Sequence, residues 1–289
     1  MLNDLRENRD KGSLRLQAEG EKKMEENFMR EIKRIIRGAG QQIREARDIH
    51  PRVKSNFRDL VTPYDLQIQK YLQSELSALL PEAAFIGEED TGSGKSLLSA
   101  VEAERCFIVD PIDGTTNFCF GIKKSCTAIA YAEKGTVMAA AVYDPFLDEL
   151  FWAERGKGSY LGEKRLQGSC GPLEEGIFIF GTSAYGEDDD LSFALIRECY
   201  ERSISLRRLG SAELDLCNVA AGRASLYFEG ALFPWDIAAG SLICEEAGMQ
   251  VFNWEHRPVE LDKKESVVAG NAETLAQWFE ILGRLRDRA

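Results

Sequence analysis

Carboxylate side chains stand where several apolar segments of this sequence end. A buried-strand pattern leads directly into Asp110, and Asp113 follows three positions later. Because the proline between them cannot donate a backbone hydrogen bond and stiffens the chain, the two carboxylates can converge across a turn. Glu88 ends an apolar stretch in the same way, and Asp236 stands just before an apolar helical segment. Oxygen donors without a nearby His or Cys suit Mg²⁺ better than zinc, so these acids predict a magnesium site.

Small residues follow the acidic pair. Gly114, Thr115 and Thr116 present backbone N–H groups where a new helical turn can begin, which favours binding of an anion. The carboxylates could hold cations, and the amides could hold a phosphate that those cations bridge. Hydrolysis of a phosphate monoester is driven mainly by positioning and charge neutralisation, so a site rich in acid and cations needs no histidine base.

Each acid also has an ordinary structural explanation when it is taken alone. Asp236 could cap the helix that follows it, and Glu88 could be a solvated loop acid. Asp110 and Asp113 could form an Asx turn. Three segment ends that all finish in acid, in a chain with few competing catalytic side chains, favour a shared site.

The charge of the chain restricts its partners. Its 289 residues include 48 acidic and 36 basic side chains, so the formal net charge is −12 at pH 7. Such a field repels nucleic acid and anionic membrane surfaces, and no apolar run reaches membrane-spanning length. We therefore expect a small-molecule partner, no nucleic acid and no membrane. The two histidines exclude a three-histidine zinc site and make a Ser-His-Asp triad improbable.

The number and spacing of the cysteines indicate the redox environment of the protein. The seven cysteines include no Cys-x-x-Cys pair, and most sit among apolar neighbours. This pattern favours buried free thiols over disulfides or metal ligands. Free thiols suit a reducing environment, so we expect a cytoplasmic protein.

Hydrophobic periodicity divides the chain into three parts. Residues 1–23 are highly charged with little periodicity and predict a disordered leader. Residues 24–170 predict an N-terminal α/β lobe that carries the metal motifs, with helices over 28–46 and 62–80 followed by strands. Residues 171–289 predict a second α/β lobe that carries the substrate segments and Asp236. The boundary between the lobes is weak and falls near 165–175.

Four segments of the sequence together resemble one known family. They are Gly87-Glu88-Glu89, the run from Asp110 to Phe118, Leu209-Gly210-Ser211-Ala212, and Trp235 to Gly240 with the downstream Glu245 to Gly248. These motifs, with the segment from Lys54 to Asp65, are similar to those of the inositol monophosphatase family of Mg²⁺-dependent, lithium-sensitive phosphatases. The resemblance runs from about Met24 to the C-terminus. It implies a homodimer and a layered αβαβα sandwich of the inositol monophosphatase and fructose-bisphosphatase type, in the α+β or α/β class.

By this resemblance, the acids hold two or three Mg²⁺ ions. One ion would be bound by Glu88, Asp110 and the backbone carbonyl of Ile112, and a second by Asp110, Asp113 and Asp236. A weaker third ion would use Glu88 and water. Glu88, Asp113 and Thr115 would be the catalytic residues, with Thr115 helping to orient and deprotonate the attacking water.

The resemblance also implies where the substrate binds. The amides of Gly114 and Thr115 would hold the phosphate. The segment Gly210-Ser211-Ala212 and the carboxylate of Glu229 would hold the alcohol part. Lys54 and Asp65 would support the mobile metal loop.

The expected activity is hydrolysis of inositol 1-phosphate, or a similar polyol phosphate, to the alcohol and phosphate. Glu229 favours a polyol because one carboxylate can accept hydrogen bonds from two hydroxyls. Fructose 1,6-bisphosphatase and 3′(2′),5′-bisphosphate nucleotidase activities stay open, although the nucleotidases usually carry Lys-Glu where this chain has Thr116-Asn117. Outside enzymes, the chain could be a regulatory protein that binds a phosphate ligand, because fold alone does not fix function.

Overall fold

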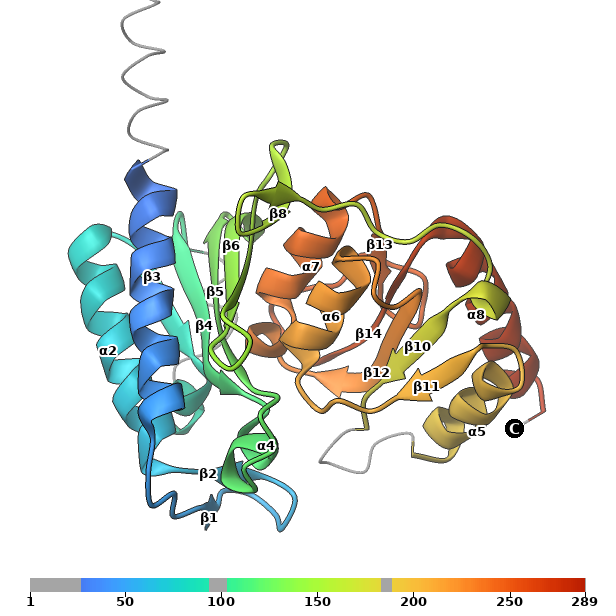
Figure 1. Ribbon diagram of the computed structural model, residues 1–289, viewed down its shortest axis with the longest axis horizontal. Helices are drawn as coiled ribbons and strands as arrows, with labels where there is room; N and C mark the ends of the chain where they lie inside the picture. Colours follow the sequence, from blue (N-terminus) through green and yellow to red (C-terminus); the bar gives the residue numbers. More distant parts are fainter. Residues whose placement is uncertain (1–26, 94–102, 183–188, 289) are drawn as a thin grey trace, which may run out of the picture.

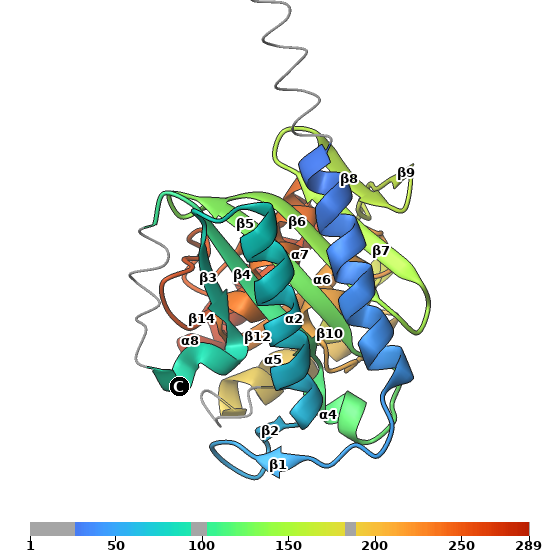
Figure 2. The same ribbon diagram turned by 90° about the vertical axis from the view of Figure 1, so that its left-hand side faces the viewer.

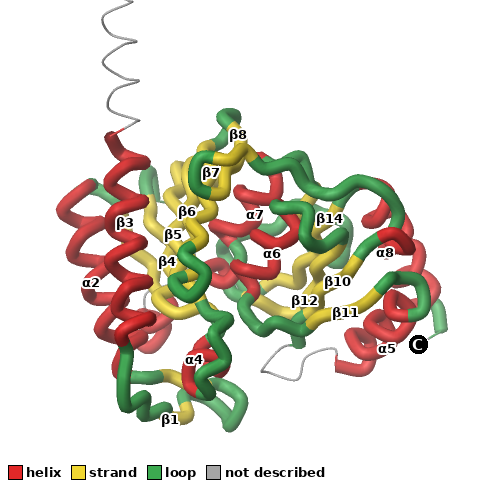
Figure 3. The backbone as a smooth tube through the Cα atoms, viewed as in Figure 1, coloured by secondary structure: helices red, strands yellow, loops and turns green. Residues whose placement is uncertain are grey.

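A computed structural model of the chain describes residues 27–93, 103–182 and 189–288. The predicted leader over 1–23 lies outside the described residues. Two large sheets, of seven and five strands, alternate with three layers of helices (Figures 1 and 3). The layered αβαβα arrangement predicted from the sequence is therefore present. Among the described residues, no helix is long and apolar enough to cross a membrane.

The seven-stranded sheet carries the first acidic segments. Its strand order is β3-β4-β5-β6-β7-β8-β9, with β3 parallel to β4 and every later pair antiparallel. The bounds are β3 Ala84–Gly87, β4 Cys106–Asp113, β5 Cys126–Glu133, β6 Thr136–Asp144, β7 Glu149–Glu154, β8 Gly158–Leu161 and β9 Lys164–Arg165.

Two helices cover the outer face of this sheet (Figure 2). One runs over residues 27–45, and the other is α2, Pro63–Leu79. The side chain of Thr62 accepts a bond from the amide of Tyr64, and Pro63 occupies the first turn, both of which favour the start of a helix here. Phe107 on β4 packs with these helices, whereas its neighbour Ile108 faces the opposite side, so the strand is buried on both faces.

The five-stranded sheet has the strand order β11-β10-β12-β14-β13. Its outer face is covered by helices α5 and α8, and helices α6 and α7 form a layer between the two sheets (Figure 1). The bounds are β10 Ile177–Phe180, α5 Asp189–Tyr200, β11 Ser205–Arg207, α6 Ala212–Ala220, β12 Leu226–Leu232, α7 Ala238–Glu246, β13 Gln250–Phe252, β14 Glu265–Gly270 and α8 Ala272–Arg286. Because α6 and α7 pack on both sheets, the division into two lobes near residue 170 stays an interpretation.

The chain departs from the predicted elements at the acidic pair. The turn expected between Asp110 and Asp113 is wrong, because β4 continues through both residues to Asp113. Its register against β5 shifts between them, which accommodates Pro111 inside a central strand. The amide of Ile112 donates to Asp110 Oδ1 at 2.9 Å within this irregular stretch. In place of a backbone turn, the two carboxylates are thus separated by a distorted stretch of strand. The bond from Ile112 to Asp110 is that of an Asx turn, the structural alternative expected for these residues.

A second feature at this end of the molecule is the segment over residues 52–61. It forms a short antiparallel hairpin from β1, Arg52–Val53, and β2, Leu60–Val61. A short helix, α4, Thr115–Cys119, follows β4 and lies beside this hairpin (Figures 1 and 2). Both elements lie at the end of β4 that carries the acids.

Candidate active site

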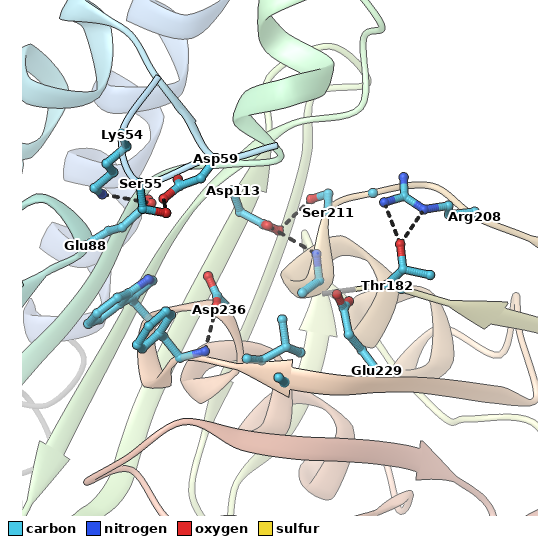
Figure 4. A pocket seen from close by; sticks show the side chains of 17 residues that line it. Lys54, Ser55, Asp59, Glu88, Asp113, Thr182, Arg208, Ser211, Glu229 and Asp236 are labelled. Atoms are coloured by element: carbon cyan, nitrogen blue, oxygen red, sulfur yellow. Dashed lines mark hydrogen bonds and ion pairs between the residues drawn. The ribbon is translucent and has the colours of Figure 1, made fainter. Parts of the chain in front are cut away.

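A cavity of about 590 Å³ lies where the hairpin, the end of β3, the start of α6 and the end of β12 meet. Figure 4 shows side chains from these separate elements facing it, with Glu88, Asp113 and Asp236 toward one end. Glu229, Thr182 and Arg208 lie toward the other end (Figure 4). Residues far apart in the sequence therefore line one cavity. A shared site of this kind was expected from the acids at the ends of the apolar segments.

Asp113 is held by the start of helix α6. Its carboxylate accepts hydrogen bonds from the Ser211 hydroxyl at 2.5 Å, the Ala212 amide at 3.1 Å and the Glu213 amide at 2.8 Å. A carboxylate at a helix N-terminus satisfies amides that have no partner within the helix and is favoured by the helix dipole. Burial raises the pKa of Asp113, and these three hydrogen bonds, together with one from the Cys126 thiol, act against that rise.

Asp110 lies deeper, with 1% of its surface exposed, and does not line the cavity as it stands. Its pKa is raised well above the ordinary value, first by burial and then by repulsion from Glu88, Asp113 and Asp236. The pKa of Asp236 is raised in the same way, while its Oδ2 accepts the Phe233 amide at 2.7 Å. These carboxylates destabilise one another in their ionised forms.

Glu88 follows β3 directly and faces a lysine. Lys54 Nζ lies 3.4 Å from Glu88 Oε1 and 3.0 Å from Glu89 Oε1, so the hairpin is tied to the acids by charge. Burial raises the pKa of Glu88 to about 8, although Lys54 lowers it. Lys54 thus contacts both Glu88 and Glu89, and its supporting role stays a prediction.

The donor set fits a hard divalent cation. Glu88, Asp110, Asp113 and Asp236 offer only oxygen atoms, and their mutual repulsion is relieved by positive charge between them. Within the described ranges, no three His, Cys, Asp or Glu side chains converge closely enough to form a closed metal cluster.

Thr115 and Asp65 form a pair beside the acids. Thr115 Oγ1 lies 2.9 Å from the Ile112 carbonyl and 3.3 Å from Asp65 Oδ1. Its single hydroxyl proton can serve only one of these acceptors at a time. Asp65 is fully buried, and its Oδ2 accepts both the amide and the hydroxyl of Thr62, at 2.7 and 2.6 Å. Asp65 therefore joins the start of α2 to the end of β4.

Gly114 packs between backbone segments where only glycine fits. Its φ is 83°, and an added Cβ would lie 2.9 Å from the Lys124 carbonyl and 3.0 Å from that of Gly210. Asn117 Nδ2 donates to the carbonyls of Lys124 and Leu209, each at 2.7 Å, and these bonds hold the same backbone segments close together. The segments 114–117 and 209–212 are thus brought together, and Gly210, Ser211 and Ala212 line the cavity. Gly114 and Thr115 lie outside that lining.

Glu229 lies at the far end of the cavity from Asp236. The Tyr227 hydroxyl donates to Glu229 Oε2 at 2.8 Å. Burial raises the pKa of Glu229 to about 7, whereas the Tyr227 bond and the positive charge of Arg208 lower it. Its side chain is placed to meet the part of a ligand that extends away from the acids.

Sequence reasoning missed several residues near the site, among them Arg208, Thr182 and Glu213. Arg208 lines the cavity two positions before Gly210, and the residues of the matched segment could have drawn attention to it. Glu213, in the first turn of α6, is completely buried. The sequence carries no signal that distinguishes it from an acidic residue on the solvent-exposed face of a helix.

Comparison with known proteins agrees with this geometry. The model of the family described as the inositol monophosphatase family matches residues 24–284. Inositol monophosphatase 2 of Saccharomyces cerevisiae is 37% identical over 206 residues, covering 68% of this chain and 70% of that protein. A putative Nus factor SuhB of Neisseria meningitidis is 34% identical, covering 88% and 97%. The solved suhB extragenic suppressor protein of Bartonella henselae superimposes with a TM-score of 0.80 at 31% identity, covering 88% and 97%. The chain therefore belongs to the inositol monophosphatase family.

Proposed function

We propose that this protein is a Mg²⁺-dependent phosphatase that hydrolyses inositol 1-phosphate or a similar polyol phosphate. The observation that carries the proposal is one cavity with carboxylates at one end and Glu229 at the other. A relative 26% identical to this chain, with a TM-score of 0.76, was solved as an inositol monophosphatase and NADP phosphatase complexed with Mg²⁺ and phosphate. That structure supports the choice of cation for this chain.

In the proposed reaction the carboxylates would hold the cations that offset the negative charge of the phosphate. When bound, Mg²⁺ would neutralise the phosphate oxygens and make water more acidic. Thr115 Oγ1, held between the Ile112 carbonyl and Asp65, would orient the attacking water and pass its proton toward Asp65. Asp65 is suited to receive that proton, because burial raises its pKa. The chain's own groups then supply the position and the proton path.

Lithium inhibition, a homodimer and a cytoplasmic location are further parts of this proposal. A staphylococcal relative, 26% identical to this chain, was solved as an inhibitory complex soaked in LiCl. Asp113 and Asp236, which face the same end of the cavity, are the residues we propose to hold Li⁺ in this chain.

Replacing Glu229 by alanine tests the polyol part of the proposal. A charged acceptor that bonds substrate hydroxyls contributes about 1.5–3 kcal/mol, so kcat/KM for inositol 1-phosphate should fall roughly ten- to a hundredfold. The rate with p-nitrophenyl phosphate, which offers no hydroxyls, should change little. Equal losses with both substrates would mean that Glu229 supports the carboxylates or the fold and does not bind the hydroxyls of the substrate. An unchanged rate with both would remove the argument for a polyol.

A bisphosphate substrate is the second candidate, and Arg208 is the observation that favours it. Arg208 Nε and Nη2 lie 3.4 and 3.2 Å from the Thr182 hydroxyl at the end of the cavity away from Asp236. Within the described ranges, no carboxylate lies within ion-pair distance of this guanidinium, whereas Lys54 is paired with Glu88 and Glu89. A guanidinium is well shaped to bind a second phosphate.

Replacing Arg208 by glutamine distinguishes the two substrates. Loss of a charge-assisted contact should raise the KM for fructose 1,6-bisphosphate about tenfold or more and leave that for inositol 1-phosphate within about twofold. Arg207→Gln is the matched control, because Arg207 is exposed and donates to Ser205 and Leu206 outside the cavity. A parallel change for both substrates in Arg208→Gln would exclude a second-phosphate role.

A regulatory role without catalysis is the remaining candidate, because some relatives are named Nus factors. Release of phosphate that stops when a chelator is added would exclude it.

A further inference from the structure

Glu213 is a buried acid that the proposed reaction does not use. It is the second residue of α6 and has no exposed surface. Its carboxylate accepts hydrogen bonds from the backbone amides of Ala239, at 3.1 Å, and Gly240. Both amides belong to the first turn of α7, so the side chain reaches from one helix to the start of the next.

Helix α7 has no cap of its own at this end. Its N-cap residue is Ile237, whose side chain has no hydrogen-bond acceptor. The amides of the second and third helical residues are the ones that an N-cap side chain normally satisfies, and in α7 these are Ala239 and Gly240. The carboxylate of Glu213 therefore replaces the missing cap. Burial and the neighbouring Asp113 raise the pKa of Glu213, and the bonds from the two α7 amides act against that rise.

The close approach depends on glycine at position 240. A Cβ added there would lie 2.6 Å from Glu213 Oε2 and 2.6 Å from Leu216 Cβ. Any larger residue would push α7 away from α6. Glu213 and Gly240 thus act as a matched pair that sets the distance between the two helices.

The contact between Glu213 and the first turn of α7 connects two of the cavity carboxylates, Asp113 and Asp236. The backbone amide of Glu213 donates to Asp113 Oδ2 at 2.8 Å. Asp236 ends the 3-10 turn Pro234–Asp236, and α7 begins two residues later. Asp113 belongs to the seven-stranded sheet and Asp236 follows the five-stranded sheet, so their relative position depends on the helix layer between them.

We propose that Glu213 is a positioning residue for the cation site. It fixes the position of Asp236 relative to Asp113, because it caps the first turn of α7, the helix that follows Asp236. The inference rests on the proposed Mg²⁺-dependent function. Residues that orient metal ligands from behind typically change metal affinity ten- to a hundredfold when they are replaced. A carboxylate that only stabilised α7 would change the melting temperature and leave cation affinity alone.

The experiment is a calorimetric titration of Mg²⁺ into the full chain, without substrate, for the parent, Glu213→Gln and Glu213→Asp. The glutamine variant keeps the length of the side chain but places an amide donor against one of the two backbone donors. The aspartate variant keeps the charge but is one methylene too short to reach both. Asn271→Ala is the matched control, because Asn271 caps α8 through the amides of Glu273 and Thr274, on the outer helix layer.

We expect Mg²⁺ binding about tenfold weaker in both Glu213 variants and unchanged in Asn271→Ala, with a lowered melting temperature in all three. At saturating Mg²⁺ the KM for inositol 1-phosphate should stay at the parent value. Parent-like Mg²⁺ affinity in both Glu213 variants would reduce Glu213 to a helix cap. Weak binding in Glu213→Gln with parent-like binding in Glu213→Asp would show an effect of charge and overturn the positioning role. A parent chain that binds no Mg²⁺ would instead remove the proposed function, and this inference with it.

Discussion

Asp110→Asn is expected to lower phosphate release at least about 1,000-fold at saturating Mg²⁺. Asp110 is proposed to contact both cations, so its loss affects the charge neutralisation on which phosphoryl transfer depends. A 1,000-fold loss corresponds to about 4 kcal/mol of transition-state stabilisation. Steady-state phosphate release from inositol 1-phosphate measures it directly, and a near-parent rate would exclude the assigned site.

The same substitution should stabilise the metal-free protein. Burial and the neighbouring acids raise the pKa of Asp110 in the folded state, so its ionisation favours unfolding. The contribution of Asp110 to the free energy of unfolding is therefore highest below the ordinary pKa of an aspartate and falls as the pH rises above it. Asparagine carries no charge at any of these pH values. At pH 7 without cations, Asp110→Asn should melt above the parent, by roughly 2–4 °C for each 1 kcal/mol of repulsion relieved. A lower melting temperature would show that Asp110 stabilises the fold instead.

Thr115→Val is expected to reduce kcat about 100- to 10,000-fold, the range typical of a group that assists proton transfer. Valine has nearly the shape of threonine but cannot orient water or hand a proton toward Asp65, which lies 3.3 Å from the hydroxyl. Calorimetric Mg²⁺ affinity should stay at the parent value, because the cation ligands are intact. This separates the effect from that of Asp110→Asn.

Thr116→Val is the matched control for this measurement. Thr116 is the next residue in the same short helix, and its side chain is exposed. Its rate should remain within a few-fold of the parent. Equal losses in the two valine variants would mean that the start of α4 is merely sensitive to substitution.

The layered fold was implied by the resemblance to a known family, whereas the acidic end of the cavity was predicted for a physical reason. A strand that ends in a carboxylate places it at an edge of a sheet, and helices with one apolar face must cover that sheet. This reasoning led to Glu88 and Asp236, which lie at the cavity. The distorted stretch around Pro111 was mistaken for a turn, because proline and two aspartates are equally typical of turns and of strand irregularities.

What the sequence did not predict depends on packing between distant segments. Nothing in Ala212-Glu213-Leu214 indicates that the acid points toward α7, since the periodicity of α6 gives no information about its neighbour. Arg208 adjoins an equally basic residue, Arg207, and only the folded chain shows which of the two lines the cavity. The capping role of Asp113 for α6 likewise joins residues about 100 positions apart.

The most direct test of the central claim is phosphate release from inositol 1-phosphate as a function of Mg²⁺ concentration, starting from protein stripped with a chelator. The clustered acids repel a phosphate dianion, so binding and turnover require cations to be present. The account predicts no detectable release without Mg²⁺, a saturable rise as Mg²⁺ is added, and loss of activity when the chelator is returned. Undiminished release in the presence of excess chelator, or no release at any Mg²⁺ concentration from any phosphate ester tried, would contradict it.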